Sequence, residues 1–528
     1  MQLWTSVVAA VVAGAVLRFA PGLAWRRHGM DSGYHLLLRR EIRRHGMRMP
    51  ARVEAMHLDE RQTYPWGYHW MLALLPERLL RAVPPLPTVL IDGVHTALVA
   101  LLAGFIAPRA VAGVSPAAAA LAAGLLFATS PALLVVGIGP RAYEITPRPL
   151  GELLYSIVLA AAAAGAVAGG GWPAIVAAAL AGGFLLLSSK FAAQVLLFTS
   201  PLLALGAGSW LPLALPPLAL AAALVISRGR YRYVLAAHVR HLLIFRRRIQ
   251  HEHSALRDRN DWPLLGRVLA AALRHPTDRA ALAAVARVAE HNTILQFALR
   301  NVLWIGVMAL VVLGAYPAWG SATEGWRRWL VAWAAAPLAP FVVTSVRSMR
   351  FLGEAERYPE YAVAAVSVLA GIALIAPRVD RPAVVAAYAL LQLPALGYSF
   401  MRQRWSSRRG VGPEMGELRR FLSTVPPASV VVPVPWYSAY VLAPDLELRF
   451  LASNDASVWY RDYDRIFTAY PWPVPDREAW RRTHGASLVL VETPLLKDAP
   501  SGAPPYQFAD LPVLFENARF RVYALNGA

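Results

Sequence analysis

Two short segments near the N-terminus carry residue types that could do chemistry. The first reads Asp31-Ser32-Gly33-Tyr34-His35-Leu36, and the second reads Tyr64-Pro65-Trp66-Gly67-Tyr68-His69. Asp31 and His35 are four residues apart, so on a helix they would share one face. A carboxylate beside an imidazole can act as a general base or hold a divalent cation. The spacing alone leaves a second interpretation open, in which Asp31 is a solvated loop carboxylate.

Other ionisable residues stand at the ends of apolar stretches. They are Arg141, Glu144, Arg148, Lys190, Glu290, Arg350 and Arg357. An ionisable group at or near membrane depth is costly and often marks a functional site. Guanidinium groups match the geometry of phosphate, so these arginines, with the lysine, are candidate phosphate ligands. Each arginine could equally be an ordinary interfacial anchor whose charged end extends toward water.

The elements that must position these residues are membrane helices. Hydrophobic residues make up 57% of the 528 residues, charged residues only 16%, and the mean hydropathy is +0.42. Soluble chains carry about 25% charged residues. Apolar stretches of roughly 18 residues or more recur, which is enough to cross a bilayer. We expect an integral membrane protein with about eleven spans, at about 2–20, 86–107, 116–137, 150–169, 172–188, 191–207, 210–226, 301–317, 328–346, 360–377 and 383–400.

Three parts of the chain fall outside these spans. Two are loops, at about 21–85 and 227–300, and the second is rich in arginine and typical of amphipathic helices on a membrane surface. The third is the tail, 410–528, where 429–434 and 486–491 resemble buried strands and 515–525 a closing hairpin. The predicted fold is an all-α membrane domain over 1–405, followed by a small soluble α/β domain over 410–528.

The charge balance limits the class of partner. The net charge is +20, and only two of the basic residues, Lys190 and Lys497, are lysines. Either GC-rich coding accounts for the arginines, or they recognise phosphate on anionic lipids or a lipid-linked substrate. Nucleic acid is not expected, because the charges lie in loops between spans. The chain has no cysteine, which excludes disulfides, thiolate metal sites and cysteine nucleophiles.

The segments around Asp31 and Tyr64 resemble the first outer loop of GT-C glycosyltransferases, multi-span enzymes that take sugars from polyprenyl-phosphate carriers. The similarity is to the catalytic subunit of oligosaccharyltransferase, and protein O-mannosyltransferases and aminoarabinose transferases share the general plan. The resemblance implies that Asp31 is the catalytic carboxylate, acting as a base or as a metal ligand, and that His35, Tyr64 and His69 contact the substrate.

The resemblance also assigns roles further along the chain. Oligosaccharyltransferases carry a paired acidic metal motif after the third span, where this chain has only Glu144, so a divalent metal such as Mg²⁺ or Mn²⁺ would rest on Asp31 and Glu144. Glu290 lies in a loop where the family has a glutamate that positions the acceptor. Arg350 and Arg357 lie in an element that recurs near the substrate cavity of these enzymes.

We therefore expect a membrane glycosyltransferase that moves a sugar or glycan from a polyprenyl-phosphate carrier to an acceptor on the outer face. The alternatives are a transporter or flippase for an anionic lipid or glycan, and a non-catalytic relative. The family's topology places the arginine-rich loops and the tail outside the plasma or inner membrane. The positive-inside rule predicts the reverse orientation. We adopt the family's topology, because an outward cavity that handles phosphate carriers would use the arginines.

Overall fold

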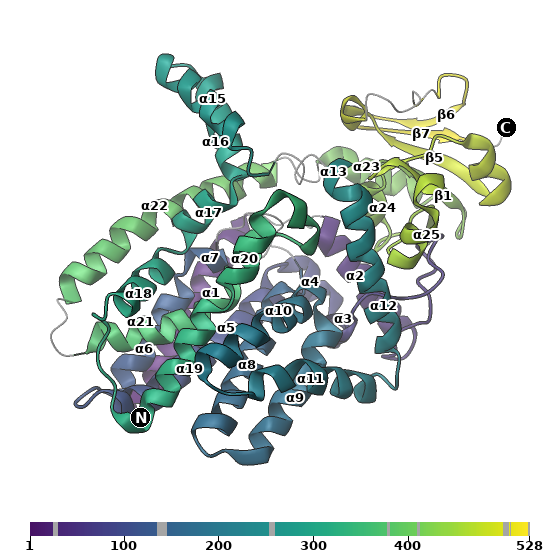
Figure 1. Ribbon diagram of the computed structural model, residues 1–528. Coiled ribbons are helices and arrows are strands. Elements are labelled where there is room, and N and C mark those ends of the chain that lie inside the picture. The colour runs from purple at the N-terminus through teal and green to yellow at the C-terminus, as the bar shows by residue number, and fades with distance from the viewer. Residues whose placement is uncertain are drawn as a thin grey trace.

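The computed structural model describes residues 1–24, 30–134, 145–252, 259–376, 381–408, 412–499, 506 and 508–525. A bundle of apolar helices occupies one end and a small sheet the other (Figure 1). The chain is thus mostly helical with one small sheet region, as the sequence predicted.

The bundle is built from helices of 4 to 28 residues, most of them apolar. They are α1 (Gln2–Ala24), α5 (Leu86–Ala110), α6 (Pro116–Ala128), α7 (Pro131–Leu134), α8 (Arg148–Val167), α9 (Gly171–Ser188), α10 (Lys190–Ala207), α11 (Leu211–Ile226), α18 (Val302–Val312), α19 (Glu324–Ala335), α20 (Leu338–Ser345), α21 (Val363–Ile375) and α22 (Arg381–Arg408). Three 3₁₀ segments, η3 (Arg347–Leu352), η4 (Ala355–Arg357) and η5 (Pro359–Ala362), lead into α21, and η2 (Ser321–Thr323) leads into α19.

Six segments among the described residues are long and apolar enough to cross a membrane: Gln2–Phe19, Leu86–Ala110, Arg148–Val167, Gly171–Ser188, Lys190–Ala207 and Ala355–Ile375. The pair Thr293–Arg300 and Val302–Val312, bent by 80°, adds a seventh if it counts as one span. Three shorter helices, Pro116–Ala128, Leu211–Ile226 and Pro382–Gly397, are also apolar. The total of about eleven spans stays a prediction.

Small residues let these helices pack closely. A Cβ at Gly371 of α21 would lie 2.7 Å from the backbone nitrogen of Ala123 in α6. Lipid tails are as apolar as leucine, so helices in a bilayer associate through close packing rather than through hydrophobic exclusion from water. Nearly all of α21 is buried, which makes it the centre of the bundle.

Between the spans lie shorter helices. The first group comprises α2 (Met30–Arg44), α3 (Gly67–Leu74) and α4 (Glu77–Ala82). The second comprises α12 (Tyr231–Ile244), the π-helix η1 (Phe245–Ile249), α13 (Gln250–Glu252), α15 (Trp262–Arg274), α16 (Arg279–Glu290) and α17 (Thr293–Arg300). The loop 227–300 is therefore helical, as predicted, and its α15–α16 hairpin extends away from the bundle (Figure 1).

The tail forms the expected α/β fold. Its elements are α23 (Pro413–Leu422), β1 (Val430–Val434), α24 (Tyr437–Leu442), β2 (Arg449–Phe450), α25 (Ala456–Ile466), β3 (Phe467–Ala469), β4 (Trp472–Pro473), η6 (Ala479–Thr483), β5 (Ala486–Glu492), η7 (Thr493–Asp498), β6 (Val513–Glu516) and β7 (Phe520–Ala524). The strand order is β2-β1-β5-β7-β6, with β1 parallel to both neighbours and β7 antiparallel to both of its own. The strands predicted at 429–434 and 486–491 and the hairpin at 515–525 are confirmed.

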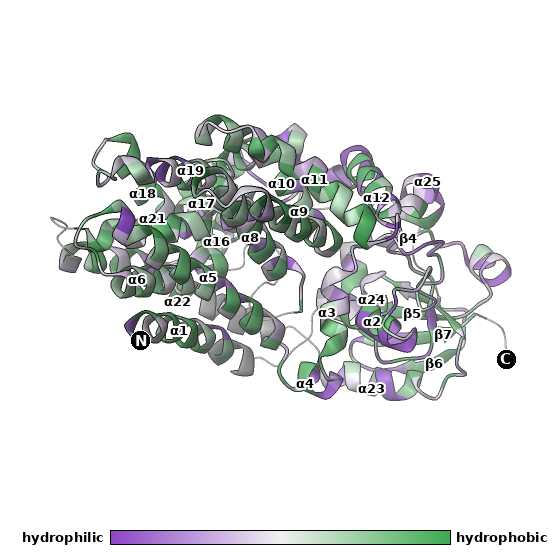
Figure 2. Cartoon of the chain, turned by 90° about the horizontal axis from the view of Figure 1, so that it is seen from below, coloured by the Kyte–Doolittle hydropathy of each residue, from purple (hydrophilic) through white to green (hydrophobic). Residues whose placement is uncertain are grey.

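Residues 30–82 and the tail share one hydrophobic core. Following the sequence prediction, we call residues 30–82 the first outer segment, and this segment together with the described residues of 412–525 the soluble body. The Phe450 amide donates to Ala55 O, and the His57 amide donates to Phe450 O, both at 2.8 Å, so this segment extends the edge of the sheet beyond β2. Figure 2 shows polar residues concentrated on this body, at α2, α23 and β6, while the bundle is mainly apolar. The boundary near residue 405 stays a proposal, and the soluble body is built from two separate segments of the chain.

Candidate active site

The beginning of α2 is held between the bundle and the tail. Asp31 is the second residue of this helix, and its side chain lies outside what the structure describes. The Ile145 amide, just before α8, donates to Ser32 Oγ at 3.0 Å. On another side, a Cβ at Gly33 would overlap the carbonyl oxygen of Tyr440 in α24, so only glycine permits this approach. The Asp31-Ser32-Gly33 segment is therefore anchored on two sides through its neighbours.

His35 and His69 form a buried pair one turn further along α2. Nδ1 of His35 lies 2.8 Å from Nε2 of His69, and the two side chains are buried. Burial lowers the pKa of His35 to about 3 and moves the pKa of His69 well below its usual value. Both imidazoles are therefore neutral at physiological pH, and one N–H is shared between them. Such a pair orients its neighbours and carries no charge to a phosphate.

Tyr64 lies between the His35–His69 pair and Lys190. Its ring centre lies 5.9 Å from that of His35 and 5.6 Å from that of His69. The Lys190 ammonium, at the start of α10, lies 4.9 Å from the centre of the Tyr64 ring. Cation–π contact of this kind orients an ammonium without neutralising it. His35, Tyr64, His69 and Lys190, predicted separately from the sequence, thus lie together.

Lys190 faces a cavity of about 350 Å³ with several basic side chains in its wall. The basic lining residues are Lys190, His238, His241, Arg259, Arg350 and Arg357. They come from α10, α12, the short segment that precedes α15, and the 3₁₀ segments η3 and η4. Phe191, Phe245 and Phe351 supply aromatic wall. Among the described residues, Lys190 has no hydrogen bond or ion pair with a carboxylate, and only the more distant Asp455 carboxylate favours its charge.

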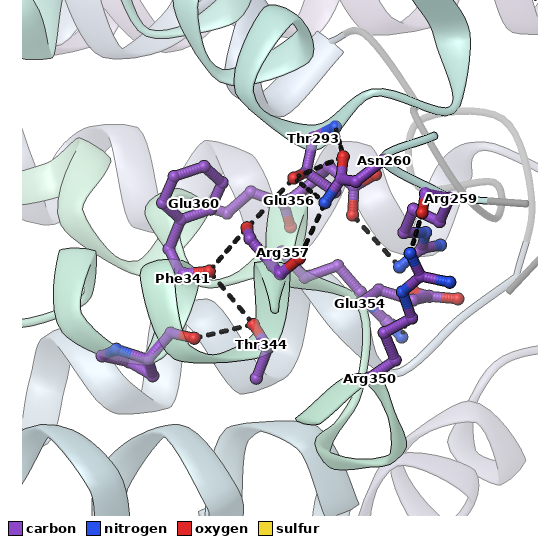
Figure 3. A network of polar contacts seen from close by, with 12 residues as sticks. Arg259, Asn260, Thr293, Phe341, Thr344, Arg350, Glu354, Glu356, Arg357 and Glu360 are labelled. Carbon is purple, nitrogen blue, oxygen red and sulfur yellow. Dashed lines mark hydrogen bonds and ion pairs between the residues drawn. The ribbon is translucent and has the colours of Figure 1, made fainter. Parts of the chain in front are cut away.

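The two predicted arginines are held in place by backbone and side-chain contacts (Figure 3). Arg350 is buried and donates to the carbonyl of Arg259. Arg357 donates to Glu354 at 2.9 Å, and its guanidinium lies 4.7 Å from the centre of the Phe191 ring. Arg350, Arg357 and Lys190 therefore share one cavity, although up to 167 residues separate them in the chain.

Sequence reasoning missed three residues of this wall. Arg259 is buried, and its Nη1 lies 3.5 Å from Oε2 of Glu356. The preceding α12 contributes His238 and His241; burial, with a smaller contribution from Lys190, lowers the pKa of His238 to about 4 and that of His241 well below its usual value. The three-residue spacing of His238 and His241 puts them on one helix face. That was a signal in the sequence, but nothing in it indicated that the face meets Lys190.

Arg148 lies elsewhere. It begins α8 and forms a two-pronged ion pair with Glu360, with its Nε 3.0 Å from Oε2 and its Nη2 2.5 Å from Oε1. Both side chains are buried, and Arg148 is not among the residues lining the cavity. Its proposed phosphate contact stays a prediction, and its charge already has a carboxylate partner.

The remaining predicted residues lie outside the cavity wall or outside the described residues. Glu290 ends α16 and does not line the cavity; the neighbouring His291 carbonyl accepts a hydrogen bond from the Asn260 amide at 3.1 Å, next to Arg259. Arg141 and Glu144 lie outside the described residues. Asn260 is itself held by Thr293, whose amide donates to Asn260 Oδ1 at 2.7 Å (Figure 3).

A metal site was expected on Asp31 and Glu144. Within the described ranges, no group of three or more histidine, aspartate or glutamate side chains converges in a way that could hold a metal ion. The Asp31 side chain and Glu144 are both outside those ranges. Use of a divalent metal therefore stays a prediction.

Comparisons with known proteins show which solved structures share this fold. No protein-family model matches the chain, and no curated protein sequence matches it. Solved structures do match. ArnT of Cupriavidus metallidurans with bound undecaprenyl phosphate is 14% identical over 99% of this chain and 98% of its own length, with a TM-score of 0.51.

Two structures of the oligosaccharyltransferase of Archaeoglobus fulgidus also match, each over 93% of this chain. The complex with an inhibitory peptide and a dolichol-phosphate is 13% identical over 69% of its length, with a TM-score of 0.53. The complex with zinc and sulfate is 12% identical over 68% of its length, with a TM-score of 0.51. At these identities the likeness concerns the fold. The chain shares the fold of these membrane proteins, in agreement with the resemblance noted in its first outer segment.

Proposed function

We propose that the chain is a membrane glycosyltransferase that moves a sugar from a polyprenyl-phosphate carrier to an acceptor on the side of the soluble body. One observation carries the proposal. Lys190, Arg350 and Arg357 line a single cavity, and Lys190 has no carboxylate partner there among the described residues. A half-buried cation that has no ion-pair partner is less favourable than a paired one, so its presence favours an anionic ligand that completes the site.

The chemistry of the cavity fits a carrier phosphate. An arginine offers a planar pair of donors to phosphate oxygens, and a lysine offers a compact charge. Phe191, Phe245 and Phe351 provide apolar surface in the same wall. The matched ArnT structure holds undecaprenyl phosphate, and one of the oligosaccharyltransferase structures holds a dolichol-phosphate. Carriers of this kind have both an anion and a long apolar chain, and the cavity has a surface for each.

The reaction proposed is a displacement at the anomeric carbon. A hydroxyl or amide of the acceptor attacks that carbon, the bond between it and the carrier phosphate oxygen breaks, and the electron pair leaves with the phosphate. Lys190, Arg350 and Arg357 stabilise the negative charge that develops on the leaving oxygen. Asp31 takes the proton from the acceptor, and the configuration at the anomeric carbon inverts.

The neutral His35–His69 pair supports this arrangement without joining the reaction. Its rings pack around Tyr64, which in turn lies against the Lys190 ammonium. The pair therefore positions Tyr64, and Tyr64 positions Lys190. Since α2 carries both Asp31 and His35, the same helix connects the proposed base to the charged cavity.

The test is sugar transfer in membranes supplied with labelled polyprenyl-phosphate sugar. Asp31→Asn should lower the transfer rate by at least about 10²-fold, the minimum typical of a lost general base. The matched control is Asp464→Asn, because Asp464 is an exposed aspartate of α25 that pairs with Arg248 on the surface. The control should transfer sugar at the wild-type rate.

Two results would count against the proposal. Unchanged transfer by Asp31→Asn would remove Asp31 from the mechanism. Wild-type protein that moves labelled carrier across vesicle membranes, but transfers sugar from none of the carriers supplied, would identify a transporter instead.

The side of the membrane needs its own experiment. We place the soluble body on the outer face, against the positive-inside rule. A C-terminal alkaline phosphatase fusion should be active, and a C-terminal fluorescent-protein fusion should be dark, in a host where each reporter works on only one side. The opposite pair of results would reverse the orientation.

A further inference from the structure

A second pocket lies beside the cavity but shares no lining residue with it. Its volume is about 890 Å³, and a smaller pocket of about 230 Å³ adjoins it through Trp66 and Arg230. The segment containing Tyr64 and Trp66 separates the two sites, since Tyr64 contacts Lys190 on one side and Trp66 lines the second pocket on the other. We call the second pocket the arginine-rimmed pocket.

The floor of this pocket is apolar and continues into the membrane helices. It is formed by Trp66, Trp70, Phe184, Leu187 and Ile226. Phe184 and Leu187 belong to α9, one of the segments able to span a bilayer, and Ile226 ends α11. Trp70 is 39% exposed and Ile226 42% exposed, so the floor is open to a ligand. Exposed apolar surface inside a pocket marks a place where apolar ligand atoms bind.

The rim of the pocket, together with its smaller neighbour, is basic. Four exposed arginines, Arg48, Arg61, Arg228 and Arg230, stand around it. None of them forms an ion pair with a carboxylate among the described residues. Arg230 donates to the Met49 carbonyl at 2.9 Å, and Arg61 lies 4.2 Å from the centre of the Tyr233 ring. Among the described residues, Arg48, Arg228 and Arg230 therefore have no carboxylate partner, and Arg61 is attracted to Glu60 without forming an ion pair.

Arginines elsewhere on the surface behave differently. Arg461 pairs with Glu60 at 2.6 Å, Arg248 with Asp464 at 2.8 Å, and Arg477 with Asp510 at 2.7 Å. The surface thus neutralises its arginines at some sites and gathers them without partners at this pocket. This concentration of positive charge at one pocket indicates a binding site for an anionic ligand, and a generally basic surface would not produce it.

Two residues of the rim, Met47 and Arg228, have a strained backbone conformation with positive φ. Met47 has φ of 65° and follows Gly46, and Arg228 has φ of 50° and precedes Gly229. A non-glycine residue in this region costs about 1–2 kcal/mol. The turns after α2 and after α11 therefore hold Met47 and Arg228 in disfavoured conformations, and both side chains line the pocket. Strain of this kind is characteristic of functional positions.

From the apolar floor and the unpaired arginine rim, we infer that the arginine-rimmed pocket binds an anionic phospholipid from the leaflet next to the soluble body. The lipid phosphate meets Arg48 and Arg228, and an acyl chain lies on Trp70, Phe184 and Ile226. A soluble phosphate compound would leave the apolar floor unused, and an apolar peptide would leave the arginines unmatched. A lipid is the ligand class that satisfies both surfaces at the level of the membrane.

The experiment measures binding of phosphatidylglycerol to the full-length protein in neutral detergent by native mass spectrometry. The test variant is Arg48→Gln with Arg228→Asn. Neither arginine side chain makes a hydrogen bond or ion pair in the described structure, and asparagine tolerates the positive φ of residue 228 better than arginine does. The control is Arg232→Gln, one turn away, whose guanidinium contacts Tyr233 and does not line the pocket.

Each arginine near a lipid headgroup contributes roughly a factor of five in affinity. The double variant should therefore weaken phosphatidylglycerol binding about 25-fold, while the control and the binding of phosphatidylcholine stay as in the wild type. Equal binding of phosphatidylglycerol by the wild type and the double variant would overturn the inference. Displacement of the lipid by glycerol 3-phosphate at equal concentration would also overturn it, because the site would then recognise a free anion. Neither readout depends on sugar transfer, so the result is independent of the proposed function.

Discussion

Arg148 and Lys190 stand at the beginnings of neighbouring bundle helices, and the protein treats their charges in opposite ways. Arg148 forms a buried two-pronged pair with Glu360. Arg18, near the end of α1, likewise pairs with Asp92 in α5. Lys190 faces a cavity, lies against the face of Tyr64, and forms no ion pair among the described residues. The two buried arginines each have a carboxylate partner inside the bundle. Lys190 has no such ion pair, so we expect the anion that pairs with it to come from a ligand.

The largest expected effect comes from breaking the compensated pair. Glu360→Gln leaves the Arg148 guanidinium buried without a full countercharge, which should lower the free energy of unfolding by about 3–5 kcal/mol. Denaturant unfolding in detergent measures this change. The control is Glu324→Gln, whose pairs with Arg327 and Arg328 are partly exposed and contribute less than about 1 kcal/mol. A wild-type unfolding curve for Glu360→Gln would show that the pair does not compensate the charge.

The uncompensated cation should show the reverse pattern. Lys190→Met removes a donor to the carrier phosphate, so kcat/KM for sugar transfer should fall by about 10²–10³-fold. The unfolding free energy should stay the same or rise, because no ion pair is lost. Lys497→Met is the matched control, since Lys497 is the chain's other lysine and is exposed in the soluble body. A large loss of stability in Lys190→Met would place Lys190 with Arg148 as a structural cation.

Asp59 provides a carboxylate counterpart at the junction between the first outer segment and the tail. It is buried, and its Oδ1 accepts hydrogen bonds from Ser453 Oγ and the Asn454 amide at 2.7 Å each. Burial nevertheless raises the pKa of Asp59 to about 7. The folded protein therefore keeps this proton to higher pH than the unfolded chain does.

The sign of the pH effect follows from that difference. As pH rises from about 4 to about 7, the unfolded state loses the Asp59 proton while the folded state retains it, so stability falls over this range. Asp59→Asn removes the titration. The melting temperature of the variant relative to wild type should then be higher at about pH 8 than at about pH 5. A difference that does not change with pH would show that Asp59 is ionised in the folded protein, and Asp464→Asn serves as the exposed control.

The smallest effect belongs to an exposed pair at the same junction. Arg461 and Glu60 join α25 to the first outer segment at 2.6 Å, with side chains 56% and 58% exposed. Glu60→Gln should change the free energy of unfolding by less than about 1 kcal/mol, because solvent screens the pair. A change as large as that of Glu360→Gln would mean that burial is not what separates the two classes of ion pair.

The sequence predicted much of the local structure. Alternation and apolar runs located β1, β5 and the β6–β7 hairpin, because strand periodicity is a short-range property. The prediction that Asp31 and His35 share a helix also holds, since both belong to α2. The cluster of His35, Tyr64, His69 and Lys190 was anticipated residue by residue, and only the structure showed that Tyr64 joins the histidine pair to the lysine.

Long-range pairing could not be predicted in the same way. The sequence around Arg148 does not predict its ion-pair partner Glu360, which lies 212 residues later. The edge pairing of Ala55 and His57 with Phe450 joins segments almost 400 residues apart, so the tail appeared from its sequence to be a self-contained domain. Arg259 and the His238–His241 face carried no pattern that connected them to Lys190.

The sequence by itself determined that the chain is a basic membrane protein with an α/β tail, because composition and local periodicity depend on the residues alone. It also determined which residue types are present for phosphate and proton chemistry. Only the tertiary structure decided which charges are neutralised and which remain available. Compensation depends on distances of a few ångströms between residues far apart in the chain, and those distances exist only once the helices have packed.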